Sequence, residues 1–230
     1  MAPTESFLTE LRAGFQRFAD PERAKGQQAY LKTLEPMLGI TNGDLRSVVN
    51  AVSLELLGRR PGLADLLAVT EYTWAHAQSR DERSAAIFLL ALPRYARLVT
   101  FDAMPLIRQL VVEGAWWDLV DALVKVQPYA RASAPAESDA LMRAWAVDEN
   151  FWIRRYAIIS QLGTKSDLDK DLLVDCILPN LADREFFVAK AIGWALRDHA
   201  RHDPEWVRAF VALHERRMQP LSRREALKHL

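Results

Sequence analysis

Apolar residues recur along nearly the whole chain in steps of three and four, the spacing that places them on one face of an α-helix. The first such stripe consists of Phe7, Leu8, Leu11, Phe15 and Phe18. It ends at Asp20-Pro21, a pair that favours a turn. A second helix is predicted after Asp44, whose carboxylate is placed to cap it, and the segment Gly58–Gly62 closes it.

The same periodicity predicts a succession of further helices separated by short loops. They cover about 63–78, 81–91, 103–112, 116–126, 138–147, 149–162, 168–178, 184–200 and 204–213. Prolines fall in the junctions or at the edges of these segments, where a helix tolerates them, at Pro93, Pro105, Pro128, Pro135, Pro179 and Pro204. The alternation typical of a β-strand is not evident. The pattern therefore predicts an all-α chain.

An internal repeat organises the C-terminal half. Trp117, Trp152 and Phe187 follow one another at intervals of 35 residues, and in this register Arg155 and Lys190 correspond. Periods in the mid-thirties are typical of two-helix solenoid repeats, which stack because one helix pair cannot bury its apolar face alone. We expect one repeat domain over 1–230, an α–α superhelix with one concave groove. A compact helical bundle is the alternative.

Composition and charge restrict the class of protein. Half of the 230 residues are hydrophobic and a quarter are charged, with a formal net charge of zero, which is typical of a globular protein. The longest apolar run is too short for a bilayer, and the N-terminus does not resemble a signal peptide. Cys176 is the only cysteine, so a small buried hydrophobe and a reducing cytoplasm are expected. Metal-ligand spacings and cofactor motifs are absent from the sequence, so neither is expected.

Residues with possible chemistry fall on the helices of the repeat. Trp117 and Asp121 are four apart, and so are Lys190 and Trp194, so each pair shares a helix face. Arg155 occupies the position that Lys190 holds in the next repeat. Two indoles, a carboxylate and two cations can therefore meet in one groove, an unusual set for a plain core.

Several segments of the chain resemble the AlkD family of HEAT-like-repeat DNA glycosylases. The matching segments are Ala115–Asp121, Phe151–Ile158, Glu185–Arg197 and Pro220–His229, with a looser match over Ala29–Ile40. They occur in the family's order and at similar spacing, and together they span nearly the whole chain. The resemblance implies a HEAT-like solenoid and a monofunctional glycosylase of base excision repair. Such an enzyme cleaves the N-glycosidic bond of cationic N3- or N7-alkylated purines in duplex DNA.

The resemblance also implies residue roles. The family's catalytic carboxylate falls on Asp121, its groove-lining indoles on Trp117 and Trp194, and its backbone-binding arginine on Arg155. Its N-terminal aromatic residue falls on Tyr30. Further residues are expected to contact DNA phosphates: Lys190, Arg197, Arg201, Arg223 and Arg224.

Two alternatives remain open because the net charge is zero, whereas DNA-binding proteins usually carry a basic excess. One is a DNA-binding family member without catalysis. The other is a repeat scaffold that binds a protein partner, as many solenoids do. For both the glycosylase and the DNA-binding protein without catalysis, we expect a monomer without cofactor, metal or membrane contact.

Overall fold

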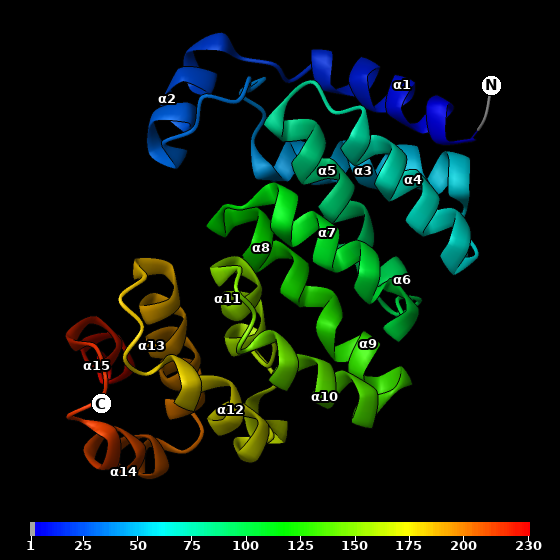
Figure 1. Ribbon diagram of the computed structural model, residues 1–230. Coiled ribbons are helices and arrows are strands. Elements are labelled where there is room, and N and C mark those ends of the chain that lie inside the picture. Colours follow the sequence, from blue (N-terminus) through cyan, green and yellow to red (C-terminus); the bar gives the residue numbers. More distant parts are fainter. Residues whose placement is uncertain (1–2) are drawn as a thin grey trace. The chain divides into compact units, whose positions relative to one another are not determined.

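The computed structural model describes residues 3–230, and every regular element in that part of the chain is helical. The prediction of an all-α helical-repeat fold is therefore confirmed. The helices gather into two compact units, one that ends at Val99 and one that spans Thr100–Leu230 (Figure 1). One repeat domain over the whole chain stays a prediction, and so does the groove along it.

The N-terminal unit packs α1 against α3 and α4, and α5 against the same two helices. Its elements are α1 (Pro3–Gln16), α2 (Pro21–Leu31), α3 (Asn42–Leu57), α4 (Leu63–Ala75), α5 (Arg80–Ala91) and α6 (Pro93–Ala96). The apolar stripe of α1 points into the core, where Phe7, Leu11 and Phe15 are inaccessible to solvent. Phe18 lies beyond the end of α1 and is exposed, so the stripe is shorter than predicted.

Side-chain caps set the start of three of these helices, α2, α3 and α5. The carboxylate of Asp20 accepts hydrogen bonds from the first backbone N–H groups of α2, so the predicted turn at Asp20-Pro21 also begins a helix. The prediction that Asp44 caps α3 is wrong, because Thr41 is the cap and its Oγ1 accepts from the Asp44 N–H at 3.1 Å. Asp44 instead lies in the first turn, where a negative charge favours the helix dipole.

The C-terminal unit is a series of stacked helix pairs. The helices α8, α11, α13 and α15 pack in that order, each on the next, while α10 packs on α12 beside them (Figure 1). The α-helices are α7 (Met104–Gly114), α8 (Trp117–Leu123), α9 (Gln127–Ser133), α10 (Pro135–Trp145), α11 (Phe151–Ile159), α12 (Lys170–Ile177), α13 (Phe186–Ala200), α14 (Pro204–His214) and α15 (Pro220–Ala226). Short 3-10 turns join some of them.

The 35-residue period has a structural counterpart in the loops before α11 and α13. Asp148 accepts the N–H of Asn150, and Asp183 accepts the N–H of Glu185, both at 2.8 Å. Each acid therefore organises the same turn one repeat apart, and the residue after the turn caps the next helix. The interval of 35 residues therefore reflects equivalent loops before α11 and α13, whereas at α8 it is Trp116, and not the predicted Trp117, that packs with Trp152 and Phe187.

Prolines mark helix starts more often than the sequence analysis anticipated. The short helices α2, α6, α9 and α15 were not predicted, and each has proline as its first or second residue. Proline suits this position because its missing N–H would have no partner in the first turn and its φ is already helical. Each junction proline named in the sequence analysis is in fact the first or second residue of a helix.

Cys176 packs as predicted, as a small hydrophobic residue in the core. It is 1% exposed, and burial raises the pKa of its thiol to about 12. The thiolate is therefore disfavoured and the thiol is unreactive. Within residues 3–230, each helix is too short or too polar to cross a bilayer.

Candidate functional site

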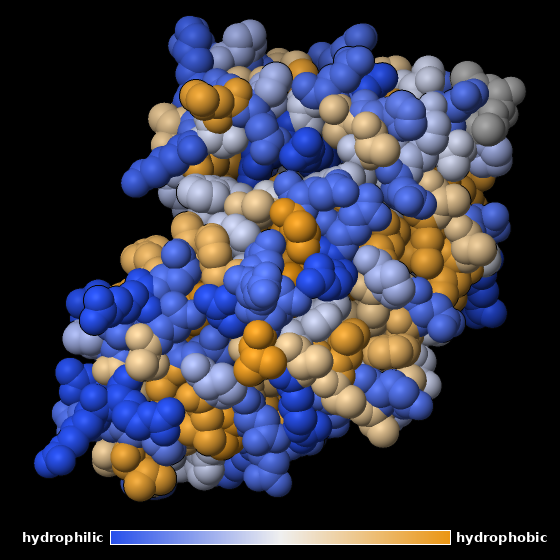
Figure 2. All heavy atoms as spheres, viewed as in Figure 1, coloured by the Kyte–Doolittle hydropathy of each residue, from blue (hydrophilic) through white to orange (hydrophobic). Residues whose placement is uncertain are grey.

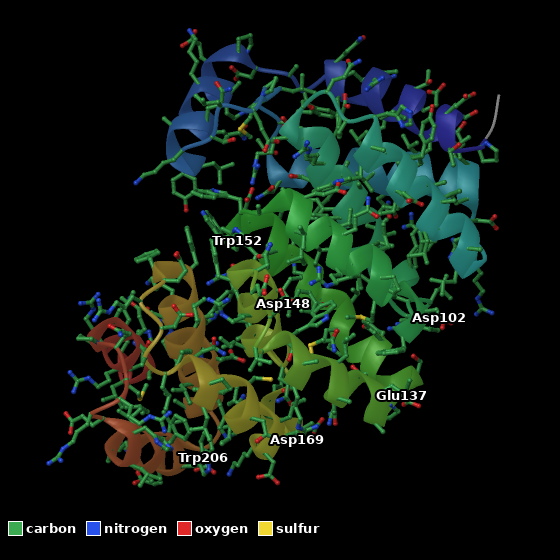
Figure 3. All side chains as sticks on the ribbon, in the orientation of Figure 1. Asp102, Glu137, Asp148, Trp152, Asp169 and Trp206 are labelled. Atoms are coloured by element: carbon green, nitrogen blue, oxygen red, sulfur yellow. The ribbon has the colours of Figure 1, made fainter. Side chains whose placement is uncertain are left out.

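The aromatic residues at the start of three stacked helices form one cluster. Trp116 immediately precedes α8, Trp152 lies in the first turn of α11 (Figure 3), and Phe187 lies in the first turn of α13. The ring centroids are 6.0 Å apart for Trp116 and Trp152, and 4.7 Å apart for Trp152 and Phe187. This packing fixes the N-terminal ends of the helices that carry the predicted site residues.

Asp121 and Arg155 form a two-point ion pair between α8 and α11. Arg155 Nε donates to Asp121 Oδ1 at 2.9 Å, and Nη2 donates to Oδ2 at 2.8 Å. A third donor, Nη1, binds the backbone carbonyl of Phe187 on α13 at 2.7 Å. Arg155 therefore ties three successive repeats together, and its guanidinium edge is already occupied by a carboxylate. A phosphate could use that edge only if the pair opened.

The pair is buried, and burial dominates its electrostatics. The side chains are 5% exposed for Arg155 and 15% exposed for Asp121. Burial raises the pKa of the Asp121 carboxyl above its ordinary value, and the hydrogen bonds and charge of Arg155 counter part of that rise. Arg155 has no acidic residue within four positions along the sequence, so its pairing with Asp121 arises only in the fold.

A cavity of about 240 Å³ opens beside the guanidinium of Arg155. Its lining is aromatic and charged, and consists of Trp117, Arg155, Phe186, Phe187, Lys190, Trp194, Arg197 and Glu225. The guanidinium carbon of Arg155 lies 6.0 Å from the ring centroid of Trp194. The structure thus brings together the predicted set of Trp117, Asp121, Arg155, Lys190 and Trp194 within the C-terminal unit.

Glu225 on α15 is a member of this cavity that the sequence analysis missed. Its carboxylate binds Lys190 at 3.0 Å and Arg197 at 2.5 Å. The hydrogen bond from Lys190 lowers the pKa of Glu225, against a smaller rise from burial, and Arg197 lowers it further. One acid therefore pairs with two predicted phosphate-binding residues and balances one of their two positive charges. Glu225 lies in the segment Pro220–His229 that carries the family resemblance, but nothing in the sequence marked it as a partner of these cations.

A glycine allows α15 to approach the cavity. A β-carbon at Gly193 would lie 2.4 Å from Glu225 Cβ and 2.9 Å from the Ser222 carbonyl oxygen. The Ser222 hydroxyl also donates to the Ala189 carbonyl at 2.9 Å. Only glycine permits this contact between α13 and α15, so Gly193 positions Glu225 against the two cations.

The other predicted DNA-binding residues lie on exposed surface. Tyr30 is on α2 of the N-terminal unit and is 73% exposed. Arg201 follows α13 and faces Asp198 at 3.8 Å, and Arg223 binds Glu215 at 2.8 Å. Arg224 is exposed on α15, where hydrophilic side chains gather on the surface (Figure 2).

The chemistry available in the cavity is that of a carboxylate, indole faces and basic side chains. In the described part of the chain, His, Cys, Asp and Glu do not gather into a group that could hold a metal ion. The indoles can attract a cation through their ring faces, and the Asp121 carboxylate beside Arg155 can stabilise positive charge that develops nearby.

The comparisons with known proteins agree on one family. The family model described as "DNA alkylation repair enzyme" matches residues 11–230. A solved structure titled "Predicted DNA alkylation repair enzyme from Enterococcus faecalis" is 30% identical, with a TM-score of 0.81. That match covers 93% of this chain and 97% of the other. The comparison with curated proteins gives no match.

Proposed function

Since this chain belongs to the DNA alkylation repair enzyme family, we propose that it is a monofunctional DNA glycosylase for cationic N3- and N7-alkylated purines. Its family supports a role in DNA repair. The proposal adds the reaction: hydrolysis of the N-glycosidic bond in duplex DNA, the first step of base excision repair. The observation that carries it is the Asp121–Arg155 pair beside a cavity lined by Trp117 and Trp194.

The substrate's own charge determines what the protein must supply. A purine alkylated at N3 or N7 is cationic, so it leaves with the electron pair of the glycosidic bond and becomes neutral. The sugar left behind has oxocarbenium character, as in glycoside hydrolysis. Water then adds to the sugar carbon and transfers its extra proton to the Asp121 carboxylate or to solvent water. A general acid is therefore unnecessary, and the main requirement is to stabilise positive charge on the sugar.

Asp121 can meet that requirement while it remains paired with Arg155. Each carboxylate oxygen has more than one acceptor site, so the two hydrogen bonds from Arg155 leave room for a water or a developing cation. Trp117 and Trp194 line the cavity and would attract the charged base or sugar through their ring faces. Arg155 holds the carboxylate in place.

Base release from duplex DNA that carries N7-methylguanine tests the proposal. Wild type should release the base, and Asp121→Asn should be slower by about 100-fold or more, the cost of removing a main electrostatic contact. Trp194→Ala should also be slower. Asp102→Asn is the matched control, because Asp102 is an exposed aspartate of the same unit, and its rate should equal that of wild type.

The other outcomes separate the alternatives. Full activity in Asp121→Asn would show that the assigned carboxylate is wrong. No release by wild type, with duplex binding intact, would indicate a DNA-binding protein without catalysis. If wild type neither releases the base nor binds the duplex, the protein would be a scaffold for another partner.

A further inference from the structure

A second cavity lies entirely within the N-terminal unit, and its lining is almost wholly basic. It has a volume of about 440 Å³ and is lined by Arg59, Arg60, Arg94, Arg97 and Leu98. Arg59 and Arg60 follow α3, whereas Arg94 and Arg97 belong to α6 and its C-terminal end. The fold therefore gathers four guanidinium groups from two segments in a protein whose net charge is zero.

The four arginines have no acidic partner in the part of the chain that the structure describes. The ion pairs found there connect none of them to a carboxylate, although arginines elsewhere in the chain are paired repeatedly. Guanidinium groups stay charged at any physiological pH. Like charges lining one cavity repel one another, so the cavity attracts an anion.

Neutral groups alone hold Arg94 in place. Its Nη2 donates to the Asn50 carbonyl at 2.9 Å and to the Ser53 hydroxyl at 2.6 Å, and Nη1 binds the Asn50 side chain. Its guanidinium carbon lies 4.4 Å from the ring centroid of Tyr95. Within residues 3–230, Arg94 Nε is buried and has no hydrogen-bond partner. The charge is thus fixed in position but not neutralised.

A buried tyrosine fastens the two arginine-bearing segments together. Tyr95 is inaccessible to solvent, and its hydroxyl lies 2.9 Å from the Ser53 carbonyl oxygen and 2.5 Å from that of Gly58. The hydroxyl can donate to either carbonyl, and both lie at the end of α3. Gly58, with φ of 71°, ends that helix and turns the chain into Arg59. The geometry of the cavity is therefore part of the fold.

We propose that this arginine cavity binds phosphate groups that together carry at least two negative charges. Guanidinium groups bind phosphate oxygens through paired hydrogen bonds. A single carboxylate would balance only one of the four charges, whereas a pyrophosphate group or two neighbouring phosphodiesters would balance more. Two sources share this chemistry: a free pyrophosphate-containing molecule, and adjacent phosphates of a DNA backbone. This inference does not depend on the glycosylase proposal, since it involves neither Asp121 nor base release.

The test compares two variants that lose the same charge. Arg60→Gln/Arg97→Gln removes two exposed arginines of the cavity, and Arg17→Gln/Arg46→Gln removes two exposed arginines elsewhere in the same unit. Titration calorimetry with inorganic pyrophosphate measures the free-ligand source. Binding of a short undamaged duplex, measured over a range of salt concentrations, tests the DNA source. Circular dichroism checks that each variant is folded.

Either source gives a distinct positive result. Pyrophosphate binding by wild type, weakened about tenfold or more in the cavity variant but unchanged in the control, identifies a free-ligand site. If pyrophosphate does not bind, the cavity variant should bind the duplex more weakly than the control does. The slope of the logarithm of its duplex affinity against the logarithm of salt concentration should then decrease by the amount expected for about two phosphate contacts. Equal behaviour of the two variants in both assays overturns the proposal, whether or not wild type releases alkylated bases.

Discussion

The cavity beside Arg155 and the arginine cavity of the N-terminal unit balance their charges in opposite ways. In the C-terminal unit, Arg155 is paired with Asp121, and Arg197 shares Glu225 with Lys190. In the N-terminal unit, none of the four arginines that line the cavity is paired with a carboxylate in the described part of the chain. A paired arginine holds its partner in position for other chemistry, whereas an unpaired one leaves its charge for a ligand.

Burial explains why the arginines of one cavity are paired with carboxylates and those of the other are not. The guanidinium of Arg155 is almost completely removed from water, and an isolated charge there would be strongly unfavourable, so the fold supplies Asp121. Arg59, Arg60 and Arg97 are exposed, and water solvates their charges without an internal acid. The fourth, Arg94, is half-buried, and neutral oxygens accept its hydrogen bonds.

The largest effect on stability should follow from breaking the buried ion pair between Asp121 and Arg155. Arg155→Met leaves the Asp121 carboxylate without its partner and should lower the free energy of unfolding by about 3–5 kcal/mol, measured by urea denaturation. Arg108→Met is the control, because Arg108 pairs with Asp148 on the surface, and its loss should cost less than about 1 kcal/mol.

A double variant separates the charge effect from lost packing. Asp121→Leu/Arg155→Met removes both charges and should be more stable than Arg155→Met alone, since no buried charge remains unpaired. A double variant as unstable as the single one would show that packing of the arginine stem, and not its charge, is what the fold requires at this position.

The sequence predicted the repeat from local spacing, and it suggested the candidate residues of the C-terminal unit from four-residue spacings together with the family resemblance. Helical periodicity identified most helices, and a repeat of 35 residues placed Arg155 and Lys190 in equivalent positions. The structure brings these residues to one cavity. The ion pairs Asp121–Arg155 and Glu225–Arg197 were not predictable, because the acids lie 34 and 28 residues from the arginines that they bind.

The arginine cavity was missed for a related reason. Arg59-Arg60 and the pair Arg94 and Arg97 are visible in the sequence, but nothing in their spacing shows that the two segments meet. The contact depends on the Tyr95 hydroxyl, which reaches the end of α3 across about forty residues of sequence. A tertiary hydrogen bond of this kind leaves no periodic pattern.

A smaller effect should follow from making the C-terminal cavity resemble the N-terminal one. Glu225→Gln removes the acid that pairs with both Lys190 and Arg197, so the cavity gains one net positive charge and both side chains become available to phosphates. Affinity for an undamaged duplex should rise about threefold to tenfold, with a steeper salt dependence, measured by fluorescence anisotropy.

The control for this variant is an exposed acid of the same unit. Glu205→Gln removes the partner of Arg208, and both side chains are already partly solvated, so duplex affinity should change little. If Glu225→Gln weakened duplex binding, the acid would instead be required to position the two cations for phosphate contact.

The smallest effect is expected in the N-terminal cavity itself. Arg60→Gln removes one of four like charges from a surface where the described chain offers it no acid, so the free energy of unfolding should change by less than about 0.5 kcal/mol. Any change should be towards higher stability at low salt, because removing one charge lowers the repulsion, and added salt should abolish it by screening. Urea denaturation at low and high salt measures both quantities. A loss of stability as large as that of Arg155→Met would mean that Arg60 has a compensating partner, and the contrast between the two cavities would disappear.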